Sequence, residues 1–197
     1  RWRRVPRVGS SDDQPRLKKV RMMETYRLVK PGASMAGQIA AYRTEFLDAG
    51  SSMDGTGPLR RMEDPLEWLA FNRLAEDEQT KPDNWVVSEQ FAFVRENDGK
   101  ILGMIQFRHS FNDFLRQYGG NIGYSVRPSE RRKGYATKML AACMDVCRDF
   151  GLDRILITCT VENEGSRRTI LSCGGVYEST VYYEKAGDTL ERYWITL

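Results

Sequence analysis

The segment between residues 119 and 161 constrains the fold more than any other part of this chain. It begins with a glycine-bearing strand pattern, GGNIGYSV (119–126), and runs through a loop into an amphipathic helical pattern that Gly151 should close. A β-rich run with little alternation, RILITCTV (154–161), follows only two residues later. Strand, helix and buried strand predict a βαβ unit, so the two strands should be parallel neighbours with a right-handed crossover.

Patterns of the same kind predict the remaining elements. We expect strands at 24–31, 89–96 and 100–109, the last two joined by the hairpin sequence Asn97-Asp98-Gly99. Helices are expected at 33–50, after Asp64-Pro65, and at 166–173. A hairpin of 176–185 with 190–197 should close the chain, and the glycine-rich loop 51–65 is either functional or disordered.

Helical spacing of apolar residues predicts which side chains face the core. For the first helix these are Met35, Ile39, Ala40, Phe46 and Leu47. For the helix at 135–151 they are Ala136, Met139, Leu140, Cys143, Cys147 and Phe150.

Length and charge bound the class of protein. A chain of 197 residues predicts one domain, here 22–197, and no apolar run approaches the roughly 18 residues of a membrane span. Residues 1–21 hold eight Lys or Arg against two Asp, whereas the rest carries a net charge of −3, which argues against nucleic-acid binding. The basic leader should be disordered, either vector-encoded or upstream sequence, with a transit peptide as the weaker alternative.

The four cysteines indicate thiols rather than a metal site. Cys143, Cys147, Cys159 and Cys173 fall inside predicted helices and strands, and the chain has one histidine. That spacing is unlike a zinc knuckle, so we expect buried free thiols, no metal and a cytoplasmic location.

The loop RPSERRKGYATKML (127–140) places cations and a glycine between a strand and a helix. A helix N-terminus gathers unpaired N–H groups, Gly134 lets the backbone approach a ligand, and Arg131, Arg132 and Lys133 add charge. The pattern matches neither the dinucleotide nor the P-loop motif. A solvated turn is the alternative, but the placement favours a diphosphate site.

The sequence VRPSERRKGYATKML resembles the acyl-CoA-binding signature of the GNAT N-acetyltransferases. Val126, Pro128, Arg131, Gly134 and Ala136 occupy its defined positions, and the likeness covers about residues 24–197. IQFRH, NEGSRRTI and RYWI are further similar to a bacterial subgroup of predicted acetyltransferases. The resemblance implies an α/β (α+β) GNAT fold: a mixed, mostly antiparallel twisted sheet of about seven strands, flanking helices, and a splayed parallel pair formed by the strands of the βαβ unit.

The resemblance also implies how acetyl-CoA, the co-substrate, is held. The backbone of Ser125 and Val126 should pair with the pantetheine arm, as an added strand would. The diphosphate should meet the amides of Arg132, Lys133, Gly134, Tyr135, Ala136 and Thr137. Asn163 should bind the pantetheine arm or merely cap a helix, and Ser166 lies one turn further on.

The reaction implied is acyl transfer from the thioester to a neutral primary amine of a small molecule or protein. His109 and Glu162 are candidate bases, with a structural histidine and an ordinary loop charge as the alternatives. Ile170 stands where many family members carry a tyrosine that protonates the thiolate. Tyr124, Tyr182, Tyr183 or solvent would have to replace it.

The acceptor site is expected around the loop 49–66. Trp68 and Trp85 either line it or belong to the core. Its carboxylates could weakly favour a cationic amine or form a solvated face: Asp48, Asp54, Glu63, Asp64 and Glu67. A catalytically silent acyl-CoA-binding module is the alternative function, and a homodimer is possible by resemblance.

Overall fold

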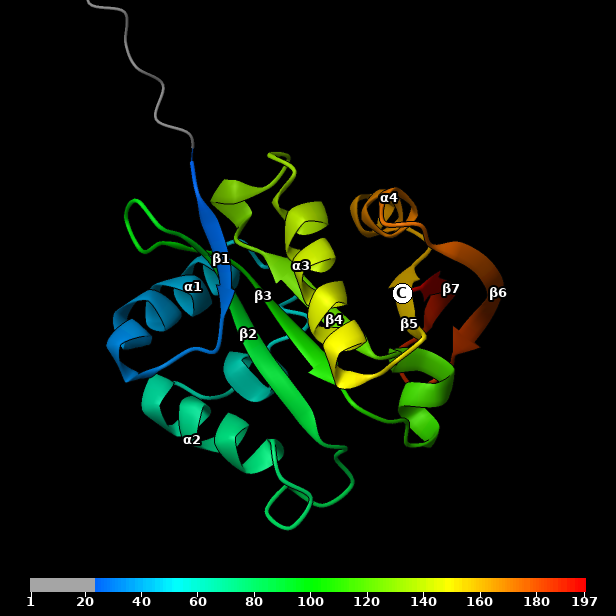
Figure 1. Ribbon diagram of the computed structural model, residues 1–197, viewed down its shortest axis with the longest axis horizontal. Helices are drawn as coiled ribbons and strands as arrows, with labels where there is room; N and C mark the ends of the chain where they lie inside the picture. The colour runs from blue at the N-terminus through cyan, green and yellow to red at the C-terminus, as the bar shows by residue number, and fades with distance from the viewer. Residues whose placement is uncertain (1–23) are drawn as a thin grey trace, which may run out of the picture.

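The computed structural model describes residues 24–197, so the expected leader at 1–21 lies outside it. Seven strands form one sheet in the order β1-β2-β3-β4-β5-β7-β6, and every neighbouring pair is antiparallel except β4 and β5, which are parallel (Figure 1). The strands are β1 Tyr26–Val29, β2 Ser88–Arg95, β3 Ile101–Arg108, β4 Ile122–Val126, β5 Arg154–Thr160, β6 Val176–Tyr183 and β7 Asp188–Thr196. The predicted βαβ unit and the closing hairpin are confirmed.

Four α-helices cover the two faces of the sheet. They are α1 Ala36–Asp48, α2 Pro65–Ala75, α3 Tyr135–Phe150 and α4 Glu164–Ser172. Asp64 caps α2, because its side chain accepts a hydrogen bond from Leu66 N at 2.8 Å, and Gly151 ends α3 in the left-handed conformation. No helix within residues 24–197 is long and apolar enough to cross a membrane.

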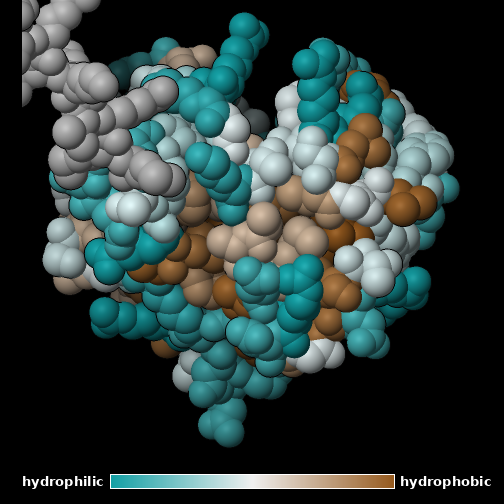
Figure 2. Space-filling model, turned by 45° about the horizontal axis from the view of Figure 1, so that its top comes forward, coloured by the Kyte–Doolittle hydropathy of each residue, from teal (hydrophilic) through white to brown (hydrophobic). Residues whose placement is uncertain are grey.

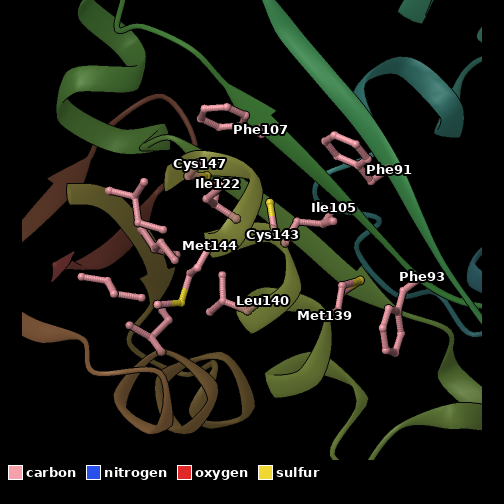
Figure 3. Packing of buried hydrophobic residues seen from close by; sticks show 14 of the residues in the cluster. Phe91, Phe93, Ile105, Phe107, Ile122, Met139, Leu140, Cys143, Met144 and Cys147 are labelled. Carbon is pink, nitrogen blue, oxygen red and sulfur yellow. The ribbon is translucent and has the colours of Figure 1, made fainter. Parts of the chain in front are cut away.

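Alternate residues of β2 serve two separate cores. Phe91 and Phe93 pack with α3 and α4, as Figure 3 shows for α3, whereas Ala92 and Val94 pack with α1 and α2. Burial on both faces explains why this strand reads as continuously apolar. All four cysteines are free thiols, and three of them are buried.

The predicted core faces were partly wrong. Tyr42 is fully buried in α1, whereas Leu47 is 38% exposed. At the C-terminal end of α3, Phe150 is 48% exposed. The loop 51–65 is packed rather than disordered, since Met53, Thr56 and Leu59 are buried and a 3-10 turn spans Gly57–Arg60.

Strands β4 and β5 meet at only one registered pair, Ile122 with Ile157. Asn121 N also donates to Leu156 O at 2.7 Å, and a side chain on Gly120 would lie 2.4 Å from that same carbonyl oxygen. No further pair joins the two strands, so a gap opens between them from Gly123 to Val126. The predicted splayed parallel pair is therefore confirmed.

Candidate active site

Buried ion pairs hold the loop that follows β4. The buried Arg127 guanidinium donates to Ile101 O at 2.7 Å and to Glu45 Oε2 at 3.1 Å. The buried Glu130 carboxylate accepts from Lys100 Nζ at 2.6 Å and from Lys133 Nζ at 2.7 Å. Burial by itself would raise the pKa of Glu130, but these two lysines lower it overall, so the carboxylate is charged at neutral pH. The loop is thus fixed before any ligand arrives.

The same loop presents a run of free backbone N–H groups. For residues 132 to 137, no acceptor lies within hydrogen-bonding distance of the N–H group anywhere in residues 24–197. Arg132 and Gly134 both have positive φ, 62° and 78°, which turns these groups outward at the start of α3. The first turn of α3 has no acidic residue and no side-chain cap. Such an end attracts an anion.

The three cations of the loop differ in their partners. Arg131 Nε donates to Val126 O at 3.1 Å and Nη2 to Ser51 Oγ at 2.7 Å, so Arg131 ties the loop to its neighbours. Lys133 pairs with the buried Glu130, as described above. Arg132 is exposed and has no hydrogen-bond partner within residues 24–197. Figure 2, in which the top of Figure 1 comes forward, shows hydrophilic side chains projecting from that end of the molecule.

The first turn of α3 offers backbone rather than side chains. Tyr135 is buried, and its ring packs against Tyr26 and Phe93, so only its N–H group faces outward. Ala136 and Thr137 are half-buried. A side chain on Gly134 would meet nothing within 4 Å, so the space in front of the helix is open.

Alternation along β4 decides which backbone groups face the gap. Arg127 N donates to Leu102 O, and Arg108 N donates to Asn121 O, both at 2.8 Å, so the odd-numbered residues of β4 face β3. The N–H and C=O groups of Tyr124 and Val126 therefore point toward β5, where the gap is. Ser125 does not fit its predicted role. Its backbone faces β3, and its buried hydroxyl donates to Asp54 O at 2.7 Å.

Helix α4 borders the gap. Asn163 caps the helix, because its Oδ1 accepts a hydrogen bond from Ser166 N at 3.0 Å. This is the helix-cap alternative of the two roles predicted for Asn163. The hydroxyl groups of Ser166 and Tyr124 lie 2.8 Å apart. Burial raises the pKa of Tyr124 to about 12, so its phenol keeps its proton at neutral pH. Ile170, in contrast, is fully buried in the core.

The remaining polar candidates lie elsewhere. His109 follows β3, and its ring stacks on Phe150 at 4.2 Å and meets Glu89 Oε2 at 3.2 Å. Tyr124, the gap-facing residue nearest to it, pairs with Ile105, so His109 lies four residues, roughly 13 Å, further along β3. Glu162 is exposed in the turn between β5 and α4. Tyr182 is exposed on β6, and Tyr183 stacks on Tyr118.

A cavity of about 470 Å³ lies on the α1 and α2 side of the sheet. Its lining comes from the loop after α1, the segment before β2, the end of β3 and residues 112–115, which lead into the π-helix Leu115–Gly119. The cavity reaches β4 because a side chain on Gly55, whose φ is +70°, would lie 2.0 Å from Gly123 O. Gly123 directly follows the last β4–β5 pair, so the cavity meets β4 where the gap begins.

The cavity corrects the expected acceptor contacts. Trp85 lines it, whereas Trp68 is fully buried in the core and donates its Nε1 hydrogen to Thr56 O at 2.8 Å. Of the five predicted carboxylates only Asp54 is in the lining. Sequence patterns gave no reason to expect its buried polar residues, which come from β2 and β3: Ser88, Gln106 and Arg108.

Comparisons with known proteins agree with this geometry. The model of the acetyltransferase (GNAT) domain matches residues 40–176. A search of curated proteins finds no match. Among solved structures, RimJ of Mycobacterium smegmatis in complex with a CoA-disulfide has a TM-score of 0.65 at 22% identity, covering 87% of this chain and 81% of that one.

Two further structures are similar in fold. The microcin C7 self-immunity acetyltransferase MccE, in complex with acetyl-CoA and AMP, has a TM-score of 0.65 at 18% identity, covering 87% of this chain and 92% of that one. The ribosomal-protein-S5-alanine acetyltransferase of Vibrio fischeri has a TM-score of 0.64 at 19% identity, covering 87% of this chain and 92% of that one. The predicted family, fold and acyl-CoA-dependent acetyltransferase class are confirmed. This chain belongs to the GNAT family of acetyltransferases.

Proposed function

We propose that this chain transfers the acetyl group of acetyl-CoA to a primary amine of a small molecule or protein. The six unpaired N–H groups from Arg132 to Thr137, beside the backbone of β4 that faces the gap, carry the proposal. Of that backbone, Val126 O is already bonded to Arg131 Nε. Together they offer a site for a diphosphate and, continuous with it, a strand edge for an extended arm.

The residues of the site suit two parts of coenzyme A, the diphosphate and the pantetheine arm. The diphosphate would bind the N–H groups of residues 132–137, with Arg132 adding charge. The pantetheine arm would lie in the gap, bonded to the backbone of Tyr124 and Val126 and bordered by Asn163 and Ser166. When bound, acetyl-CoA supplies the thioester that the amine attacks.

Proton transfer is assigned from geometry. Tyr124 is the candidate acid, because its protonated hydroxyl bridges the gap to Ser166. Asp54 is the carboxylate in the cavity lining, so it can accept the proton of the amine directly or through water. Glu162 remains an alternative base, and His109 is assigned a structural role.

A turnover assay separates this proposal from the silent acyl-CoA-binding module. Purified protein, acetyl-CoA, a thiol-detecting dye and a panel of primary amines should give amine-dependent CoA release. Binding of acetyl-CoA by calorimetry with no release across the panel would favour the silent module. An absence of acetyl-CoA binding would overturn both.

The cysteines bear on the cellular setting. Unpaired thiols such as Cys143 and Cys147 favour a reducing compartment, so we propose a cytoplasmic enzyme. The homodimer and the lack of nucleic-acid binding stay predictions.

A further inference from the structure

Two polar side chains in the cavity lack a partner. Ser88 and Gln106 are 3% and 2% exposed, and no hydrogen-bond partner lies near Ser88 Oγ or Gln106 Nε2 in the part of the chain that the structure describes. Gln90 Oε1, on the residue that pairs with Gln106 across β2 and β3, also has no partner there, but Gln90 does not line the cavity. Arg108 Nε donates to Gln106 Oε1 at 3.3 Å, and since arginine only donates, this contact fixes which end of the amide faces the arginine. Gln106 Nε2 is therefore a free donor. Buried polar groups nearly always have partners, so these two atoms point to a ligand.

The neighbouring arginine has no carboxylate partner. Arg108 Nη1 donates to Gly119 O at 2.8 Å and to Gly120 O at 3.3 Å, while Nη2 has no acceptor within residues 24–197. No Asp or Glu oxygen of those residues lies within 4 Å of this guanidinium, unlike that of the buried Arg127, which pairs with Glu45. Burial lowers the pKa of Arg108 to about 10, which still leaves the group charged at neutral pH.

The absence of a side chain at Gly123 on β4 leaves room for the Arg108 guanidinium. A side chain on Gly123 would lie 2.8 Å from Arg108 Nη2, so the glycine admits the charged group next to the start of the gap. Asp54 lines the same cavity, beside apolar groups that include Trp85 and Leu115. Free donors, an unpaired cation, one carboxylate and an apolar wall therefore line the same cavity.

We propose that the acceptor amine carries a carboxylate, which Arg108 and Gln106 bind, so that the substrates are small zwitterionic amines of the amino-acid type. Arginine and amide donors suit the two oxygens of a carboxylate, and Asp54 suits the ammonium group before it loses its proton. The inference rests on the proposed acetyl transfer and replaces the weak expectation of a cationic amine, since a polyamine would meet Arg108 with like charge.

The test compares pairs of acceptors that differ only in the carboxylate. CoA release is measured with a panel of L-amino acids, the corresponding amino-acid amides, aminoalkyl phosphonates and spermidine. The amides have the less basic amine, so intrinsic reactivity favours them. We expect amino acids to exceed their amides in kcat/KM by at least about tenfold, against that intrinsic order.

Two variants assign the preference to the cavity. Gln106→Glu keeps the shape, replaces the free donor by a carboxylate and neutralises Arg108, so the preference for the acid should disappear or reverse. Arg108→Gln should also remove it, but it loses bonds to Gly119 and Gly120, which makes the first variant the safer test. Gln79→Glu and Arg73→Gln make the same chemical changes at exposed positions and should behave as wild type.

The outcomes are distinct. An acid preference that Gln106→Glu abolishes, with the acetyl-CoA Kd unchanged, supports the inference. Equal or better turnover of amides, phosphonates or spermidine overturns it while the proposed function stands. Acetyl-CoA binding with no turnover of any amino acid also overturns it, and loss of acetyl-CoA binding in the wild type would instead sink the proposed function.

Discussion

The two faces of β4 differ in what they offer a ligand. Toward α3 and α4, the gap and the loop after it present backbone N–H groups, six of them consecutive and unpaired. Toward α1 and α2, the cavity presents side chains, among them Gln106 and Arg108, with donors left free. One strand thus separates a surface made of main chain from a surface made of side chains.

This difference has a functional meaning. Backbone groups bind any diphosphate arm of the right shape, and almost any side chain can stand at their positions, which suits a cofactor shared by a family. Side chains can be exchanged one at a time, which suits an acceptor that differs between members. The first surface should therefore respond to backbone strain, and the second to single polar changes.

The largest expected effect comes from strain at Gly134. A valine there would be held at positive φ, a state that costs about 1–3 kcal/mol, and relief of the strain would turn the N–H groups away. We expect the acetyl-CoA Kd measured by calorimetry to rise roughly hundredfold. Gly187→Val places the same strain in the β6–β7 turn, where φ is +74°. It should lower stability similarly and leave the Kd unchanged; equal Kd values for both variants would contradict a backbone-built site.

Removal of the Tyr124 hydroxyl should have the next largest effect. Tyr124→Phe should lower kcat by about 30-fold, below the usual general-acid contribution because a thiolate leaves readily, with little change in acetyl-CoA affinity. Steady-state kinetics and calorimetry measure the two effects. Tyr182→Phe and Tyr183→Phe are the matched controls. A loss of kcat in either of them but not in Tyr124→Phe would show that the general acid is a tyrosine of β6 rather than Tyr124.

Substitutions of the two adjacent arginines of the loop should differ in effect, one on acetyl-CoA affinity and the other on stability. Arg132→Gln should raise the acetyl-CoA Kd about fivefold without changing the free energy of unfolding, since this exposed side chain has no hydrogen-bond partner among residues 24–197. Arg131→Gln should instead lower the free energy of unfolding by about 1–2 kcal/mol, because its bonds to Val126 O and Ser51 Oγ are lost. Denaturant unfolding beside calorimetry checks both, and the reverse pattern would show that Arg131 is the phosphate ligand.

The smallest effect on catalysis is expected at His109. His109→Gln should change kcat by less than about twofold and leave the pH dependence of kcat unaltered, because the ring packs on Phe150 and meets Glu89 Oε2. Burial alone would raise the pKa of Glu89, but Lys30 and His109 lower it overall, so its stabilising contribution is lost as the pH falls through that lowered pKa. In the variant the folded-state pKa of Glu89 should be less depressed, so this loss should be smaller and complete at a higher pH. A tenfold fall in kcat would restore His109 as the base.

Local pattern was sufficient for the cofactor side. The glycine-bearing strand, the loop and the helix are contiguous, so the position of Gly134 at a helix N-terminus could be predicted from residues that are neighbours in the chain. The same holds for the Asp64 cap and the Asn97-Asp98-Gly99 turn. Side-chain periodicity failed at Leu47 and Phe150, near helix ends where the neighbouring elements decide burial.

The acceptor side depended on contacts between distant segments. Asp54, Trp85, Gln106 and Arg108 come together only because the loop after α1 lies on Gly123, and no local pattern encodes that contact. Register likewise turned Ser125 toward β3 and placed Tyr124 against Ser166. The sequence alone thus determined a helix end with free N–H groups, which needs only consecutive residues, whereas tertiary packing decided which side chains line the cavity, because those residues share a site without being neighbours in the chain.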